Sequence, residues 1–250
     1  MRAAIALVKS LEKLGVKHIF GITGAMIIPV FDALYDSNQI RYIHMRNEQA
    51  ASYAADGYAR ASGEPGVCIA TSGPGATNLV TGVVNAYMDS SPLIAITGQV
   101  GRGMIGTDAF QEADMVGVLM PHVKHNYLVM NAKELVDIVR QAFKIATTGR
   151  PGPVHIDIPV DMQMVDIEFD EKIFNTEVKL RSKSQLEPDI ESIKKAADLL
   201  IKAERPIIIA GGGAIWSNAS KQLISLAEYL AIPVATASMG KGVIPENHPL

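Results

Sequence analysis

One glutamate, Glu48, stands at the junction between a short apolar strand pattern, residues 40–44, and a helix pattern of small residues, 48–61. In α/β folds, side chains at strand-to-helix junctions lie at the edge of the sheet where ligands bind. A carboxylate at such a place can accept or donate a proton in catalysis. The helix dipole supplies a structural alternative, because it favours an acidic residue in a first helical turn. The stretch by itself leaves both interpretations open.

A glycine-rich loop, residues 71–78, follows a strand pattern and opens a helix. Backbone N–H groups at such a helix start can hold an anion or a polar ring. The loop is not a Walker P-loop, since no Gly-Lys-Ser/Thr follows, and it is not a dinucleotide fingerprint, since Asn78 stands at the third glycine position. A tight turn that leaves Asn78 on the helix explains the pattern equally well.

Three consecutive glycines, Gly211, Gly212 and Gly213, follow an apolar strand pattern, and Glu228 lies at the sequence distance typical of a ribose contact. A single glycine turn is weak evidence, so we interpret it as a plain strand-to-helix turn, with nucleotide binding as the alternative. The histidines show no metal-ligand spacing and no H-E-x-x-H motif occurs. The sequence therefore predicts no metal site in this chain.

The elements that position these loops alternate between strands and helices, which predicts an α/β fold with a parallel sheet flanked by helices. Strands are predicted at 18–20, 40–44, 66–70, 92–97, 123–129 and 153–158. Helices are predicted at 3–14, 48–61, 75–88 and 132–147. The loops that follow the strands should then meet at one edge of the sheet.

Three segments are predicted along the chain: a first domain at 1–162, a charged linker at 163–187, and the start of a second α/β domain at 188–250. The second domain shows helix patterns at 189–203 and 217–230 and strand patterns at 206–210 and 232–235. Two strands are too few for an independently stable sheet. We therefore expect a truncated, Rossmann-like central domain, and a chain that is part of a longer or split protein.

Composition excludes several classes of function. The formal net charge of −3 and the pI near 6.1 give no electrostatic footprint for nucleic acid or an anionic membrane. No apolar run reaches the length of a membrane span. The only cysteine, Cys68, lies in an apolar strand pattern and has no partner for an intrachain disulfide, which favours a buried thiol and a cytoplasmic protein.

Several stretches match one family in order and spacing. They are Gly15-Val-Lys-His-Ile-Phe-Gly21, Arg46-Asn-Glu-Gln-Ala50, Asp56-Gly-Tyr-Ala-Arg-Ala-Ser-Gly63, Ser72-Gly-Pro-Gly-Ala-Thr-Asn-Leu-Val-Thr-Gly82, Ile105-Gly-Thr-Asp-Ala-Phe-Gln-Glu112, Val123-Lys-His-Asn126 and Thr148-Gly-Arg-Pro-Gly-Pro153. With these stretches the chain resembles the N-terminal part of thiamine-diphosphate enzymes of the acetolactate synthase (acetohydroxyacid synthase) type. The resemblance implies that the first domain binds the aminopyrimidine half of that cofactor.

The resemblance implies a catalytic role for Glu48, because its counterpart hydrogen-bonds a ring nitrogen of the pyrimidine and shares a proton with it. The resemblance implies pyrimidine contacts at Pro74 and Asn78 and positions near the reactive thiazolium at Gly24 and Gln111. It implies FAD-contacting positions at Arg150, Gly211, Gly212 and Gly213. Substrate-side positions are implied at Ala25 and Phe110.

The family's reaction decarboxylates pyruvate and joins the remaining two carbons to pyruvate or 2-oxobutanoate, in the synthesis of valine, leucine and isoleucine. The resemblance implies thiamine diphosphate and Mg²⁺, with FAD as a further candidate, and a homo-oligomer that is at least a dimer. A small regulatory subunit is a candidate partner. The family's Mg²⁺ and diphosphate site lies in a later domain, and its Gly-Asp-Gly stretch has no match here. We therefore expect the 250-residue chain to be inactive alone.

One departure from the family keeps a second enzyme class open. The family has Pro-Lys-Asp-Val where this chain has Pro159-Val160-Asp161-Met162, so a lysine linked to substrate and FAD contacts is missing. Another thiamine-diphosphate-dependent 2-keto-acid decarboxylase or carboligase is the resulting alternative. A non-catalytic nucleotide-binding module that uses the Gly211 loop is the further alternative.

Overall fold

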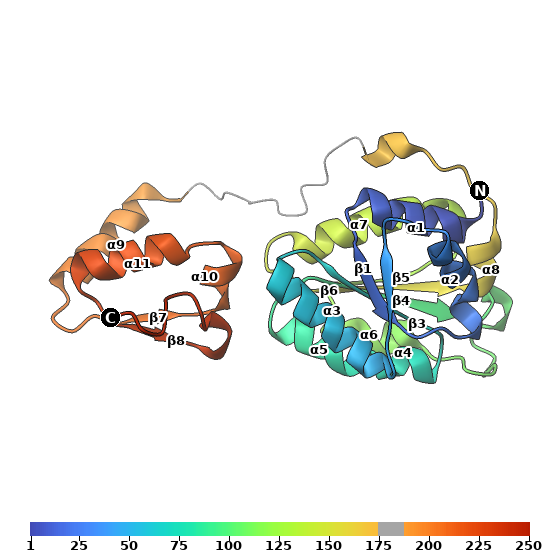
Figure 1. The fold of residues 1–250 in the computed structure, drawn as a ribbon, viewed down its shortest axis with the longest axis horizontal. Helices are drawn as coiled ribbons and strands as arrows, with labels where there is room; N and C mark the ends of the chain where they lie inside the picture. The colour runs from blue at the N-terminus through green and yellow to red at the C-terminus, as the bar shows by residue number, and fades with distance from the viewer. Residues whose placement is uncertain (175–187) are drawn as a thin grey trace. The chain divides into compact units, whose positions relative to one another are not determined.

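The computed structural model describes residues 1–174 and 188–250, which form two compact units, Met1–Ser184 and Gln185–Leu250 (Figure 1). Residues 175–187 of the predicted linker lie outside the described residues. None of the helices within 1–174 and 188–250 combines the length and the apolar character that a bilayer crossing requires.

Unit 1 contains a six-stranded sheet in which every neighbouring pair is parallel, as the alternation of elements predicts. In spatial order the strands are β2 (Arg41–His44), β1 (His18–Gly21), β3 (Gly66–Ala70), β4 (Leu93–Gln99), β6 (Pro153–Pro159) and β5 (His125–Leu128). The central strands β3, β4 and β6 are buried along their whole length. The fold class is therefore confirmed.

Helices cover both faces of the sheet (Figure 1). One face carries α1 (Ala3–Lys13), α2 (Ile28–Tyr35), α7 (Leu135–Thr147) and α8 (Val160–Met164), and the other carries α3 (Glu48–Ser62), α4 (Pro74–Asn78), α5 (Val80–Met88) and α6 (Met115–Leu119). Short 3₁₀ turns are η1 (Ala25–Ile27), η2 (Arg102–Met104), η3 (Met120–His122), η4 (Ala132–Glu134) and η5 (Glu171–Phe174). Alternate strand residues feed two separate cores, because side chains on a strand point to opposite faces.

Three local predictions differ from the structure. The helix predicted at 75–88 is two helices, α4 and α5, that meet at Leu79. The five-residue helix α6 was not predicted, because it is too short to show a helical repeat. Residues 163–174, predicted as the beginning of the linker, are structured: Ile167 is buried, and Phe169 and Phe174 pack against the core of unit 1. Apolar side chains placed between the charged ones explain that packing.

Helices α3 and α5 approach each other closely, because small residues line their interface. A β carbon on Gly82 of α5 would collide with Ser52 of α3, and one on Gly66 of β3 would collide with the backbone of Ala55. Close backbone approach of this kind requires glycine. Its result is that α3, which begins at Glu48, is seated tightly against both β3 and α5.

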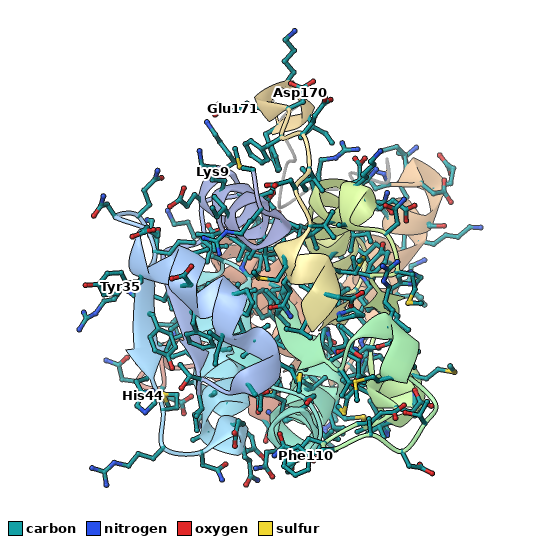
Figure 2. All side chains as sticks on the ribbon, turned by 90° about the vertical axis from the view of Figure 1, so that its right-hand side faces the viewer. Lys9, Tyr35, His44, Phe110, Asp170 and Glu171 are labelled. Atoms are coloured by element: carbon teal, nitrogen blue, oxygen red, sulfur yellow. The ribbon has the colours of Figure 1, made fainter. Side chains whose placement is uncertain are left out.

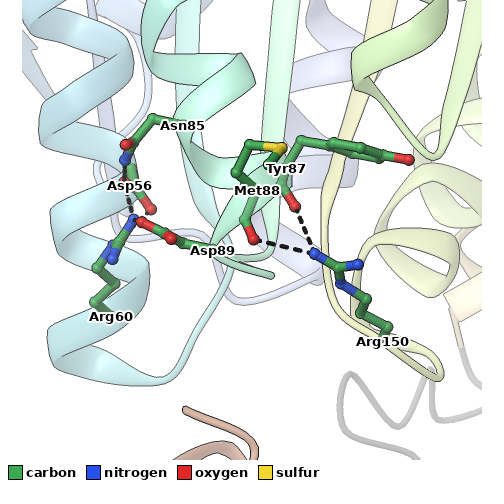
Figure 3. Close-up of polar contacts among 7 residues, drawn as sticks. All are labelled: Asp56, Arg60, Asn85, Tyr87, Met88, Asp89 and Arg150. Carbon is green, nitrogen blue, oxygen red and sulfur yellow. Dashed lines mark hydrogen bonds and ion pairs between the residues drawn. The ribbon is translucent and has the colours of Figure 1, made fainter. Parts of the chain in front are cut away.

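A polar cluster fixes the register of the same two helices (Figure 3). The Asp56 carboxylate of α3 is buried and accepts hydrogen bonds from Arg60 at 2.7 Å and from Asn85 of α5 at 2.8 Å. Arg60 also donates to Asp89 at 2.8 Å. These contacts raise the pKa of Arg60 above its ordinary value, with the Asp56 hydrogen bond as the largest cause. The cluster joins the Asp56–Gly63 stretch to the chain around residue 89 and so serves the fold.

Replacing Asp56 with Ala is expected to lower the free energy of unfolding by about 3 kcal/mol, because the half-buried Asn85 loses its acceptor and the half-buried Arg60 keeps only Asp89 of its two carboxylate partners. Urea unfolding followed by circular dichroism measures this loss. The control is Lys13→Ala, which removes an exposed ion pair with Glu171 and should change stability little. Equal losses in the two variants would contradict the assignment.

Unit 2 is smaller and holds a two-stranded parallel sheet of β7 (Ile208–Ala210) and β8 (Val234–Thr236). Its helices are α9 (Ile190–Lys202), α10 (Gly212–Trp216) and α11 (Ser220–Leu230), followed by the 3₁₀ turn η6 (Ser238–Gly240). Its core cluster comprises Ala210, Val243 and Ile244. Leu199 and Ile209 are more than two thirds exposed, so this unit buries little apolar surface among the described residues.

Candidate active site

The candidate site lies where the sheet changes its direction of progression. From β1 the chain passes outward to β2 on one side, and it then returns to place β3 on the other side of β1. Ligands of open parallel sheets bind at such a switch point, outside the carboxyl ends of the strands. The loops that follow β1, β2 and β3 meet at this edge, and they lead into η1, α3 and α4.

Glu48 is the first residue of α3, and the local sequence holds it there. The Asn47 side chain accepts a hydrogen bond from the backbone N–H of Gln49 at 2.8 Å, which is an N-cap. The Glu48 side chain is half-buried, and its Oε2 accepts a hydrogen bond from Asn78 Nδ2 at 3.0 Å. A contact across 30 residues thus joins the two motifs that the sequence singled out. The other carboxylate oxygen, Oε1, has no hydrogen bond among the described residues.

The glycine loop passes close to that carboxylate. A β carbon on Gly75 would lie 2.7 Å from Thr71 Cγ2 and 3.4 Å from Glu48 Oε1. The first distance is shorter than van der Waals contact, so only glycine lets the loop pass this close to Thr71. An open carboxylate oxygen beside a glycine cradle fits the edge of a planar ring that presents a nitrogen to Glu48.

Thr71 is a site residue that the sequence reasoning missed. A β carbon on Gly24 would lie 2.5 Å from Thr71 Cβ, and the Thr71 hydroxyl accepts a hydrogen bond from the backbone N–H of Met26 at 3.2 Å. Thr71 therefore packs the loop after β1 against the loop after β3. The available signal was its position directly after a buried strand, at the beginning of the glycine loop.

The backbone of Gln111 packs against the same loop at Gly73. Gly73 has a φ of +56°, and a β carbon there would lie 2.6 Å from the backbone oxygen of Gln111. Glu112 shapes the approach, because its carboxylate accepts backbone N–H groups from Gly106, Ala109 and Thr107. These hydrogen bonds, with Gly106 first, hold the pKa of Glu112 below its usual range.

The remaining predicted site residues of unit 1 fall into two groups: Pro74, Ala25 and Phe110 lie at the same end of the sheet as Glu48, and Arg150 lies at the other end. Pro74 is exposed at the start of α4, Ala25 is exposed at the start of η1, and Phe110 is 80% exposed next to Gln111. Figure 2 shows Phe110 and His44 at the lower end of the view, opposite Lys9, Asp170 and Glu171.

Arg150 lies elsewhere, since it precedes β6 and Glu48 follows β2, so the two residues occupy opposite edges of the parallel sheet. Its guanidinium donates to the carbonyl oxygens of Tyr87 and Met88 (Figure 3). It also donates to Ser90 Oγ. A cation at this end of α5 satisfies free helix carbonyls, which gives Arg150 a structural use. Its contact with a cofactor stays a prediction.

In unit 2, Gly211 is the N-cap of α10, and Gly212 and Gly213 are its first two residues. The triple-glycine segment therefore begins a short helix directly after β7, and the sequence did not predict that helix. Within 1–174 and 188–250 no group of three or more His, Cys, Asp or Glu side chains is arranged to hold a metal ion.

Comparison with known proteins identifies the class. Residues 1–118 match the N-terminal TPP binding domain of thiamine pyrophosphate enzymes, and residues 193–250 match the central domain of the same enzymes. The chain belongs to the thiamine pyrophosphate enzyme family, and the candidate site falls within the matched N-terminal domain.

The particular relatives are acetolactate synthases. Over 251 residues the chain is 54% identical to the probable acetolactate synthase large subunit of Methanocaldococcus jannaschii, covering 100% of this chain and 42% of the relative. It is 46% identical over 251 residues to the acetolactate synthase large subunit of Corynebacterium glutamicum, covering 100% of this chain and 40% of that relative. It is 47% identical over 249 residues to the large subunit of Mycobacterium tuberculosis, covering 99% and 40%. The chain thus spans two fifths of the length of these relatives, corresponding to an N-terminal portion.

Proposed function

We propose that this chain supplies the pyrimidine-binding side of an acetolactate synthase active site. The complete enzyme condenses pyruvate with pyruvate or 2-oxobutanoate, with loss of CO₂, in branched-chain amino-acid synthesis. The observation that carries the proposal is the pair formed by Glu48 and Asn78, at the sheet's switch point and beside the Gly75 cradle. The relatives are named for the synthesis of acetolactate, and the substrates of the proposal are those that the family resemblance implies.

Glu48 acts as the proton-sharing group. Its free oxygen, Oε1, accepts or returns a proton at a ring nitrogen of the bound pyrimidine, and Asn78 holds the other oxygen so that the carboxylate keeps one orientation. Gly75 and Thr71 shape the wall on which the ring rests, and Pro74 borders it at the start of α4. When bound, thiamine diphosphate supplies the electron sink for decarboxylating a 2-keto acid.

In this proposal Gly24 and Gln111 lie near the reactive thiazolium, and Ala25 and Phe110 lie on the substrate side. Gly24 is the N-cap of η1 and Ala25 is its first residue. The backbone of Gln111, the residue after Phe110, packs against the glycine loop at Gly73. Phe110 presents an exposed ring, and apolar contact with the methyl group of a small 2-keto acid is a fitting use for it.

Further parts of the proposal rest on the relatives rather than on the geometry of these residues. Mg²⁺ and the cofactor's diphosphate are assigned to a part of the complete enzyme that this chain does not contain. The complete enzyme is a homo-oligomer, at least a dimer, with a small regulatory subunit as a candidate partner. FAD is a further candidate cofactor of the proposal, and the family resemblance marks the Gly211–Gly213 turn of unit 2 and, considered separately, Arg150 of unit 1 as candidate contacts. The single, buried Cys68, whose pKa burial raises to about 12, suits a reducing cytoplasm.

A second candidate activity is that of another thiamine-diphosphate carboligase or decarboxylase, and Val160 favours it. Val160 begins α8 at the position where the family has lysine. The carboxylate of its neighbour Asp161 accepts a hydrogen bond from Arg102 Nε at 2.8 Å. A cation is therefore absent from a position where the family places a substrate contact.

Product analysis of the complete protein decides between the two activities. Incubation with pyruvate, thiamine diphosphate and Mg²⁺ should yield 2-acetolactate, and added 2-oxobutanoate should yield 2-aceto-2-hydroxybutyrate. Acetaldehyde, or condensation with an aldehyde acceptor as the main product, would favour the second candidate. The 250-residue chain, assayed by itself under the same conditions, should give neither product.

A further inference from the structure

Five polar side chains form a row on the sheet face that α6 covers. Thr97 and Gln99 lie on β4, His155 and Asp157 lie on β6, and Asn126 lies on β5. All except Asn126 are at least 97% buried. They share one face because alternate strand residues do so, and because the register pairs Thr97 with Asp157 and Asn126 with His155.

The row is continuous. Thr97 Oγ1 lies 2.6 Å from Asp157 Oδ1 and 2.7 Å from His155 Nε2. Gln99 donates to Asp157 Oδ2 at 3.0 Å, and His155 Nδ1 lies 3.0 Å from Asn126 Oδ1. The two end residues of the row hydrogen-bond to backbone outside the sheet. Gln99 donates to the carbonyl oxygen of Ala113 at 2.8 Å, and Asn126 donates to the carbonyl oxygen of Val116 at 3.2 Å.

Counting hydrogens shows that the row holds one more proton than an ionised Asp157 and a neutral His155 supply. A carbonyl only accepts, so Asn126 presents its NH₂ to Val116 and its oxygen to His155, whose Nδ1 must carry a hydrogen. The Thr97 hydroxyl has one hydrogen for two short contacts. The second hydrogen must come from Asp157 or from His155 Nε2.

Burial places that proton on Asp157. Desolvation raises the pKa of Asp157 to about 7 and lowers that of His155 to about 3, so the neutral acid and the neutral imidazole coexist. Asp114, the N-cap of α6, adds a negative charge that favours protonated Asp157. The other groups facing the pair, Thr97, Gln99 and Asn126, are uncharged.

We propose that a single buried proton resides on Asp157 and is linked to neutral His155 through the Thr97 hydroxyl, and that this row is a positioning network for residues 109–118. The segment it holds at Ala113 and Val116 carries Gln111 and leads into α6. A catalytic consequence of that positioning rests on the proposed function, whereas the shared proton does not.

In the proposed protonation state, the pair Asp157 and His155 adds no pH dependence to the free energy of unfolding. On folding, Asp157 gains a proton and His155 loses one, so between about pH 4 and pH 6.5 the pair binds the same number of protons in both states. Taken alone, Asp157 makes the protein less stable as the pH rises, and His155 alone makes it more stable. The two opposite slopes cancel while both groups are present.

Urea unfolding of the 250-residue chain over that range tests the cancellation. Relative to the parent, Asp157→Asn should show an unfolding equilibrium constant that falls by up to about tenfold per pH unit as the pH rises, and His155→Asn should show one that rises equally. Taking the pH dependence of each variant relative to that of the parent cancels the contribution of the other titrating groups. Curves that run parallel to the parent in both variants would overturn the proposal.

Two further measurements need neither cofactor nor substrate, so their outcome is independent of the enzymatic assignment. Nitrogen NMR of the folded chain at about pH 6 should show neutral His155 with its hydrogen on Nδ1; hydrogens on both nitrogens would overturn a neutral Asp157. Hydrogen exchange should speed up across 111–118 in Thr97→Val and return toward the parental rate in Thr97→Ser. Unchanged exchange in Thr97→Val would overturn the positioning role.

Discussion

Replacing Glu48 with Gln is expected to lower the turnover of the complete enzyme by on the order of 10²- to 10⁴-fold, the range of a lost general acid–base group. The amide keeps the size of the side chain and can still meet Asn78, whose partner atom is a single oxygen at 3.0 Å. It cannot accept or return a proton. Steady-state assays with pyruvate measure the loss, and circular dichroism should show an unchanged fold.

The matched control for that experiment is Glu64→Gln, which alters an exposed glutamate just beyond the end of α3. It should leave turnover within a factor of two or three of the parent, since surface substitutions rarely matter. Near-parental turnover in Glu48→Gln would remove Glu48 from the mechanism, whatever the control does.

The second large effect is expected at Asn78. Asn78→Ala removes the hydrogen bond to Glu48 Oε2, and a bond to a charged group contributes about 1.5–3 kcal/mol, so kcat/KM should fall roughly 10- to 150-fold. Asn78→Asp should be worse, because it places a second carboxylate against the first and the two repel unless they share a proton. Measuring kcat/KM for both variants ranks them.

Thr77→Ala is the control for the Asn78 variants. Thr77 is an exposed neighbour on α4, and its hydroxyl bonds only locally, to the carbonyl of Pro74 at 3.2 Å. Its removal should cost little activity. An Asn78→Asp enzyme that is as active as Asn78→Ala would show that the amide does not act through Glu48.

The sequence could predict the parts of the site that local chemistry specifies. The helix predicted at 48–61 is observed as Glu48–Ser62, because an Asn47 cap begins it and Gly63, with a φ of +75°, ends it. The strand predicted at 66–70 is observed with the same bounds, since its five buried residues lie between Pro65 and the glycine loop. Parallel pairing then brings the loops to one edge without further information.

What could not be predicted depends on contacts between distant residues. The approach of Gln111 to Gly73 spans 38 positions, and no local signal marks it. The polar row was hidden for a different reason: Thr97 and His155 occur in strands that read as apolar, and only the register shows that they face each other. Burial of Asp157 likewise follows from α6, a helix too short for the sequence pattern to show.

The glycines around the site differ in whether a side chain would collide with neighbouring atoms, and this difference shows which positions mutagenesis can vary. Gly24, Gly73 and Gly75 face neighbours at 2.5–2.7 Å from a would-be β carbon, so a mutagenesis library that randomises them would be dominated by misfolded members. Gly103 meets nothing within 4 Å and has no positive φ. A library aimed at new substrate preferences should therefore vary the stretch from Gly103 to Phe110, apart from Gly106 and Asp108, whose φ angles are +83° and +56°, and leave the glycine loop untouched.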